Sequence, residues 1–172
     1  VIADHARGIA FLLAEGVVPG NEGRGDVLRR ILRRAVRSGR RLGMHEAFLG
    51  PIVEAVIDKM GIVYPEIAEE RETILIALAA EEGRFQETLS SGLNIIEGIV
   101  AEVRARNENL IPGAEVFRLY DTYGFPPEIA EEIAQEEGLT LDWDGFGRAM
   151  EEQRGRARAS QTRMTGSVNL DT

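Results

Sequence analysis

Seven arginines on one predicted helix offer the clearest chemistry in the sequence, which is the binding of phosphate. At about 100° per residue they fill one arc of the helix, opposite an apolar arc. Neighbouring like charges on a helix repel each other, and a polyanion would offset that repulsion. Guanidinium groups also suit bidentate phosphate contact. The pattern indicates either contact with a nucleic acid or a structural network with acidic residues elsewhere in the chain. The arginines are Arg29, Arg30, Arg33, Arg34, Arg37, Arg40 and Arg41.

A glycine-rich stretch, residues 20–25, directly precedes this helix. Such a turn before a helix N-terminus can hold a phosphate. However, no strand is predicted before it and no Gly-Lys-Ser/Thr follows, which argues against a nucleotide-binding loop. The stretch instead predicts a strained turn that places Asn21 and Arg24 at the start of the helix.

A second candidate is the dense polar and aromatic cluster at residues 118–126, with Asp121 at its centre. In one interpretation the aromatic residues form a rigid platform, and Asp121 accepts hydrogen bonds from a base amino group. In the other, the aromatic residues plug a core and Asp121 caps a backbone turn. The residues alone favour the second interpretation.

Catalytic and metal-ligating residues are not predicted in this chain. The two histidines, His5 and His45, are 40 positions apart and have no cysteine to join them, since the sequence contains none. Acidic runs such as 69–70 and 81–82 are interpreted as solvated helix faces. The net charge is −9, yet residues 1–41 hold nine arginines against four acidic residues. This basic region on an acidic chain would attract a polyanion to one face.

Apolar spacing predicts helices, and nothing alternates as βαβ, so the expected fold class is all-α. We expect a helical bundle with one long helix or helix pair and a smaller C-terminal helical subdomain. The predicted domains are a core with the arginine-rich helix (1–106), a C-terminal helical part (107–159) and a disordered tail (160–172). The predicted helices span 2–15, 27–42, 45–60, 65–106, 127–137 and 143–159, with a short element at 115–123.

The chain begins at Val1 rather than at Met, which predicts a piece excised from a longer protein. No run of about 20 apolar residues is present, so no membrane segment is expected. The lack of cysteine is compatible with the reducing cytoplasm, where we expect the protein to work.

Several stretches together resemble the alanyl-tRNA synthetase family, over residues 1–159. They are residues 1–7, 10–12, 21–25, 27–37, 117–126 and 150–154. The resemblance implies the central tRNA-recognition region of a class II ligase that attaches alanine to tRNA with ATP. It implies ATP and Mg at an aminoacylation site upstream and Zn at an editing site downstream, and no cofactor in this fragment.

The resemblance also implies the site residues. Asn21 and Asp121 match an Asn and an Asp that read a G·U wobble pair in the tRNA acceptor stem. The shallow minor groove of an RNA helix exposes the unpaired guanine 2-amino group to such side chains. We infer that neighbouring arginines bind the RNA backbone. They are Arg24, Arg29, Arg30, Arg33, Arg34 and Arg37. The expected partners are the tRNA(Ala) acceptor stem and the adjoining aminoacylation and editing domains, with no membrane. The alternative is an acidic helical protein-interaction scaffold that does not bind RNA.

Overall fold

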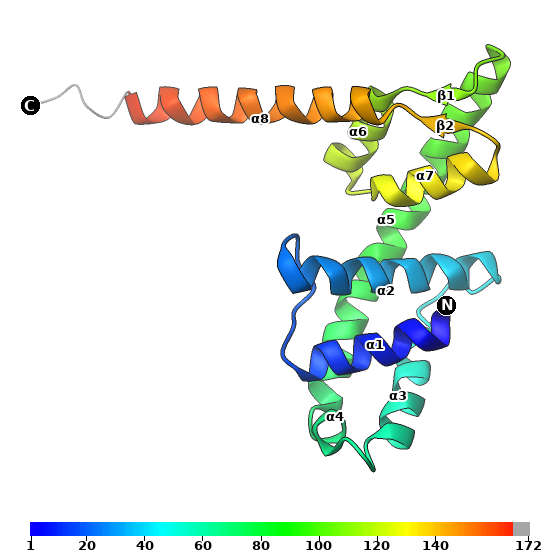
Figure 1. Cartoon of the computed structure of the whole chain (residues 1–172), viewed down its shortest axis with the longest axis vertical. Helices are drawn as coiled ribbons and strands as arrows, with labels where there is room; N and C mark the ends of the chain where they lie inside the picture. The colour runs from blue at the N-terminus through cyan, green and yellow to red at the C-terminus, as the bar shows by residue number, and fades with distance from the viewer. Residues whose placement is uncertain (167–172) are drawn as a thin grey trace, which may run out of the picture. The chain divides into compact units, whose positions relative to one another are not determined.

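The computed structural model describes the backbone of residues 1–166 and the side chains of residues 1–156. Within this range every regular element is a helix except for two short strands, which confirms the all-α prediction (Figure 1). The elements are α1 (Ile2–Ala14), α2 (Gly23–Arg41), α3 (Leu49–Met60), α4 (Pro65–Glu69), α5 (Arg71–Ala105), β1 (Leu110–Ile111), α6 (Gly113–Tyr123), α7 (Pro127–Glu136), β2 (Thr140–Leu141) and α8 (Trp143–Gly166).

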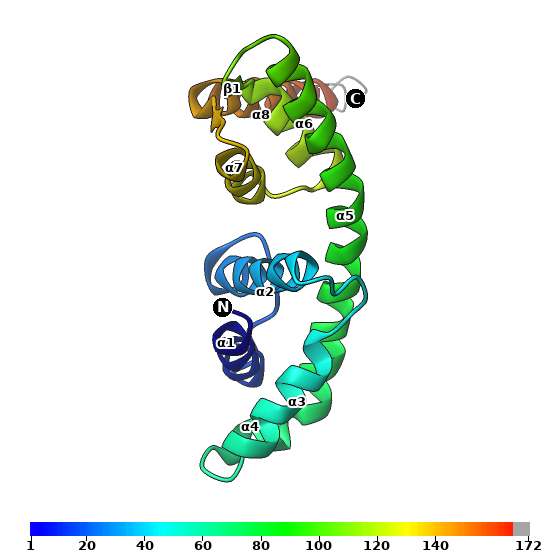
Figure 2. The ribbon, with the colours of Figure 1, turned by 90° about the vertical axis from the view of Figure 1, so that its right-hand side faces the viewer.

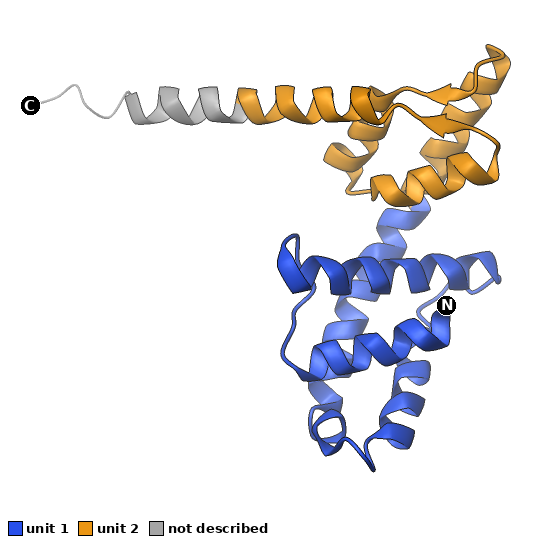
Figure 3. Cartoon of the chain, viewed as in Figure 1, with its two compact units in different colours: residues 1–90 blue, residues 91–172 orange. Residues whose placement is uncertain are grey.

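The chain divides into two compact units, residues 1–90 and 91–172, shown in separate colours in Figure 3. We call them unit 1 and unit 2. The long helix α5 contributes residues to both. Our sequence-based boundary lay at 106/107, where α5 ends, because composition marks the end of a helix more clearly than a change of packing partner within it.

In unit 1, α1 and α2 pack against each other and lie on one side of α5 (Figure 2). The apolar arc of α2 is largely buried, as its spacing predicts, and so is an apolar stripe of α5. Within unit 1, the fully buried apolar side chains of these two helices are Leu28, Leu32, Ala35, Val36, Ile74, Leu78, Phe85 and Leu89. Burying large apolar side chains of this kind is the main force that holds the helices together.

The start of α2 differs from our prediction, which began this helix at residue 27. The helix begins at Gly23, so that Asp26 lies in its first turn. Gly23 adopts a φ of +56°, which an L side chain would strain. The Gly20 N–H donates to the Gly25 carbonyl at 3.0 Å. A Cβ on Gly25 would lie 2.5 Å from the Val18 carbonyl oxygen, so glycine lets the loop fold back onto the helix.

Two carboxylates that we interpreted as solvated are instead buried, and this prediction was wrong. Glu81 and Glu82 of α5 are each 1% exposed. Glu82 Oε1 accepts hydrogen bonds from the backbone N–H groups of Phe48 and Leu49, at 2.8 and 3.1 Å. It thereby caps the start of α3, where no local side chain does so. Pro51 falls within the first turn of α3 and does not break it.

Unit 2 is built around Phe125, which is fully buried. A Cβ on Gly92 of α5 would lie 2.0 Å from the Phe125 ring, so only glycine lets the ring pack this closely. The strands β1 and β2 pair in parallel, and α6 and α8 follow them directly. The two helices start against each other at Gly113, whose added Cβ would lie 2.1 Å from the Phe146 nitrogen.

The last helix, α8, runs to Gly166 and so continues past residue 159, where we expected it to end. The part of our predicted tail at 160–166 is therefore helical, and residues 167–172 lie outside the described residues. No helix in the described part is both long and apolar enough to span a membrane.

Candidate nucleic-acid interface

Five of the seven arginines in the arc of α2 fall into two rows, each with a spacing of four residues, and the other two, Arg40 and Arg41, lie at the end of the helix. Arg29, Arg33 and Arg37 form a covered row. Arg29 and Arg33 have side chains that are 21% exposed, and Arg37 is 6% exposed. Arg30 and Arg34 form the next row round the helix and are exposed. The helical period explains the split, because residues four apart share a face and residues one apart do not.

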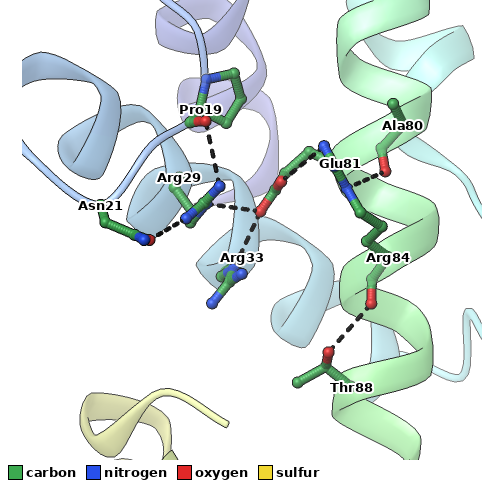
Figure 4. A network of polar contacts seen from close by, with 8 residues as sticks. All are labelled: Pro19, Asn21, Arg29, Arg33, Ala80, Glu81, Arg84 and Thr88. Carbon is green, nitrogen blue, oxygen red and sulfur yellow. Dashed lines mark hydrogen bonds and ion pairs between the residues drawn. The ribbon is translucent and has the colours of Figure 1, made fainter. Parts of the chain in front are cut away.

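Two arginines of the covered row, Arg29 and Arg33, pair with Glu81 of α5. Its Oε1 atom lies 3.1 Å from Arg29 Nε and accepts a hydrogen bond from Arg33 Nε at 3.2 Å. Arg84, also on α5, lies 3.4 Å from Glu81 Oε2. Figure 4 shows Glu81 directed at both arginines of α2. A carboxylate this deeply buried has to be paired with charge and hydrogen-bond donors, because an isolated buried charge is very costly.

The Arg33 guanidinium is held by contacts within the protein. Its guanidinium carbon lies 5.0 Å above the centre of the Phe85 ring, in a cation–π contact. Burial lowers the pKa of the Arg33 guanidinium below its ordinary value, while Glu81 raises it and Arg29 lowers it. Arginine remains protonated in proteins, so the group serves here as a fixed positive charge.

Asn21 lies exposed in the loop before α2. Its Oδ1 atom accepts a hydrogen bond from Nη1 of Arg29, and Nη2 of the same guanidinium donates to the Pro19 carbonyl at 3.2 Å. In Figure 4, Arg29 stands between Asn21 and Glu81. The loop, α2 and α5 are therefore joined through one guanidinium group.

The remaining predicted phosphate ligands face solvent. Arg24, with a side chain 77% exposed, lies 3.8 Å from Glu15. Arg30, 56% exposed, pairs with Asp26 at 3.1 Å, one helical turn away. Exposed ion pairs of this kind contribute little to stability, about 0–1 kcal/mol, so a phosphate could replace the carboxylate at small cost.

Asp121 belongs to unit 2 and lies exposed on α6. Its Oδ1 atom accepts a hydrogen bond from Gln153 Nε2 of α8 at 3.2 Å. A carboxylate has about four lone-pair sites, so this bond leaves it able to accept others. In the surrounding cluster, Phe125 is a core residue, whereas Tyr120 and Tyr123 are each 42% exposed.

Sequence reasoning missed Glu81, Glu82 and Gln153 as parts of these arrangements. A signal for the two glutamates was present, because they fill the gap in the apolar stripe of α5 between Leu78 and Phe85. Gln153 lies in one of the stretches that carry the family resemblance, but its type and spacing alone predict no role. Among the described residues, no group of three or more acidic or histidine side chains is arranged to hold a metal ion.

Comparison with known proteins gives a consistent result. The chain is 53% identical to an alanine–tRNA ligase of Pelotomaculum thermopropionicum over 161 residues, which is 94% of this chain and 18% of the relative. It is 52% identical to one of Chloroflexus aurantiacus over 165 residues, 96% of this chain and 18% of the relative. It is 50% identical to one of Streptococcus pneumoniae over 170 residues, 99% of this chain and 19% of the relative. The chain thus spans about a fifth of the length of these curated relatives.

The comparison with protein families covers the chain from end to end. The model of the family described as "tRNA synthetases class II (A)" matches residues 1–172. Since this match includes every residue of both units, the chain belongs to the class II (A) family of tRNA synthetases.

Proposed function

We propose that this chain is the acceptor-stem recognition region of an alanine–tRNA ligase, and that it reads a G·U wobble pair from the minor groove. The relatives that it matches at 50–53% identity carry that enzyme name. The observation that supports the reading role best is the exposure of both candidate side chains, Asn21 and Asp121, which leaves them accessible to RNA.

The chemistry of the two side chains suits this task. In a G·U wobble the guanine 2-amino group is unpaired and projects into the shallow minor groove, which side chains can reach. The Asp121 carboxylate can accept its hydrogen bond, and the Asn21 amide supplies a further polar contact. One such charge-assisted contact is worth about 1–3 kcal/mol, or about tenfold to a hundredfold in affinity.

The exposed arginines supply the contacts to the RNA backbone in this proposal. They are Arg24, Arg30 and Arg34, which lie at the start of α2 and along its exposed row. Phosphate contacts of this kind fix the position of the protein on the duplex without reading its sequence. Arg29, Arg33 and Arg37, which we had also expected to bind phosphate, are covered by the fold and are left out of this set.

The parent enzyme in this proposal attaches alanine to tRNA(Ala) in the cytoplasm. Its aminoacylation domain would use ATP and Mg, and its editing domain would hold Zn. We assign no catalytic residue and no cofactor to this chain. Its role is to place the acceptor end for a reaction that the adjoining domains carry out, and correct placement can itself accelerate a reaction.

A gel-shift titration tests the reading role. It compares acceptor-stem hairpins that carry G·U or G·C, using the wild type, Asn21→Ala and Asp121→Ala. We expect the wild type to prefer G·U by about tenfold or more, and each variant to lose much of that preference. Asp144→Ala is a matched control, because it removes another exposed carboxylate of unit 2. Equal loss of preference in the control and in Asp121→Ala would contradict the proposal.

The alternative is a helical scaffold that binds proteins and not RNA. It predicts no hairpin binding at moderate salt and no dependence on the G·U pair. Membership of the synthetase family does not favour it.

A further inference from the structure

The contact between Asn21 and Arg29 fixes the direction of the Asn21 amide. A guanidinium group has five N–H donors and no acceptor, so the amide atom that faces it must be the oxygen. The Asn21 oxygen is thus engaged by Arg29. Within the part of the chain whose side chains are described, the Nδ2 group of Asn21 makes no hydrogen bond, and the residue is exposed.

Arg29 is itself held from the other side. Its Nε atom lies 3.1 Å from Oε1 of Glu81, and its Nη2 atom donates to the Pro19 carbonyl at 3.2 Å. The Glu81 side chain is 2% exposed, so this anchor lies in the protein interior. A chain of contacts therefore runs from a buried carboxylate on α5, through Arg29 on α2, to an exposed amide in the loop (Figure 4).

We propose that Glu81 and Arg29 are positioning residues that hold Asn21 with its NH₂ group toward the RNA, so that Asn21 acts as a hydrogen-bond donor. It then reads an acceptor in the minor groove: the pyrimidine O2, the purine N3 or a ribose 2′-hydroxyl. The guanine amino group, which needs an acceptor, is left to Asp121. This inference rests on the proposed function. It adds that Asn21 donates a hydrogen bond to the RNA, and it names the residues that orient the Asn21 amide.

A purely structural role for Glu81 can be separated from this one, because Arg33 shares the same carboxylate. Like Arg29, Arg33 links α2 to Glu81 of α5, and it also contacts Phe85, but the Asn21 oxygen accepts its hydrogen bond from Arg29 and not from Arg33. Arg33→Met is therefore a matched control for Arg29→Met. Both variants remove a guanidinium from Glu81, but only Arg29→Met frees the Asn21 amide to turn.

The first test measures the preference for a G·U over a G·C hairpin, using the full chain. Circular dichroism confirms that each variant is folded. We expect Arg29→Met and Glu81→Gln to lower the preference by about threefold to tenfold, the effect of one hydrogen bond, and Arg29→Lys to restore part of it. Arg33→Met should leave the preference unchanged, because Arg33 pairs with Glu81 and not with Asn21. Loss of preference in Arg33→Met equal to that in Arg29→Met would overturn the positioning role.

A double-variant comparison shows whether Glu81 acts through Asn21. In an Asn21→Ala background, Glu81→Gln should change the preference by less than about twofold, because the side chain that it positions is gone. A further loss as large as in the wild-type background means that Glu81 acts by another route, which overturns the inference. If Asn21→Ala alone leaves the preference intact, the proposed reading role of Asn21 fails, and that result is distinct from the failure of the positioning role.

The polarity of Asn21 is tested with Asn21→Asp, which keeps the shape and the oxygen but has no donor. We expect it to lose as much preference as Asn21→Ala. Retained preference would show that the oxygen is the reading atom and would overturn the inference. Hairpins with 2-thiouridine, 3-deazaguanosine or a 2′-deoxyribose at the pair identify the acceptor. Removal of the acceptor that Asn21 contacts should weaken binding by the wild type but not by Asn21→Ala. If none of the three modified hairpins shows this difference, the donor role of Asn21 is overturned.

Discussion

Replacement of Glu82 by alanine should destabilise unit 1 by about 2–4 kcal/mol. The Glu82 carboxylate is the acceptor for two backbone N–H groups, those of Phe48 and Leu49, at 2.8 and 3.1 Å. It is 1% exposed, so water cannot readily take its place. Each buried donor left without a partner costs about 1–3 kcal/mol. Loss of a helix N-cap by itself costs about 0.5–2 kcal/mol and describes part of the same effect, so the two figures are not added.

The conservative variant Glu82→Gln separates the roles of charge and shape. Its side-chain oxygen can still accept from both N–H groups, but it lacks the charge that makes such bonds about twice as strong. We expect a loss of about 1 kcal/mol, clearly less than for alanine. Glu87→Ala is the matched control, because Glu87 is an exposed glutamate on the same helix, and surface changes of this type stay within about 0.5 kcal/mol.

Urea unfolding followed by circular dichroism measures these free energies. Amide hydrogen exchange over residues 48–60 adds a local reading, because loss of the cap should speed exchange first at the start of α3. The capping role is refuted if the free energies of unfolding of Glu82→Ala and Glu87→Ala agree within about 0.5 kcal/mol. It is also refuted if amide exchange in α3 is unchanged in Glu82→Ala.

Two further predictions use paired variants. Gly92→Ala should lower the free energy of unfolding by about 1–3 kcal/mol, because the added Cβ would lie 2.0 Å from the buried Phe125 ring. Gly98→Ala places its Cβ where no atom lies within 4 Å, and it should raise the free energy of unfolding by up to about 1 kcal/mol. Thermal unfolding measures both. Arg30→Ala should weaken binding to G·U and G·C hairpins equally and lower the salt dependence by about one phosphate contact, while Asp26→Asn, which frees Arg30 from its ion pair, should strengthen both equally. Unequal effects on the two hairpins would contradict a backbone role.

The helical part of the fold was largely predictable from the sequence, because apolar spacing is a local property. The buried set on α2, including Leu28, Leu32 and Ala35, follows directly from that spacing. The paired strands β1 and β2 were not predictable as a sheet. Each has two residues, which is too short to show alternation, and the partners Leu110 and Thr140 are far apart in the sequence.

The candidate site was predictable in its residue types but not in its connections. The sequence places Asn21 directly before α2 and the arginines along this helix, and the family resemblance adds Asp121. Glu81, 48 positions from Arg33, could not be assigned as their partner, because an acidic residue in a long helix is usually solvated. Only the packing of α2 on α5 shows which carboxylate is buried beside which arginine.

The two rows of arginines on α2 show why an entire charged arc cannot be assigned to a ligand. An arc this wide on a helix that packs against a neighbour must have one edge close to that neighbour. On α2 this edge is the row of Arg29 and Arg33, which pair with Glu81 of α5, and the row of Arg30 and Arg34 remains exposed. The acids of α5 therefore decide which arginines can meet a phosphate. Because Arg29 also donates to the Asn21 oxygen, the pairing that stabilises the fold also sets, in our proposal, the direction of the amide offered to RNA.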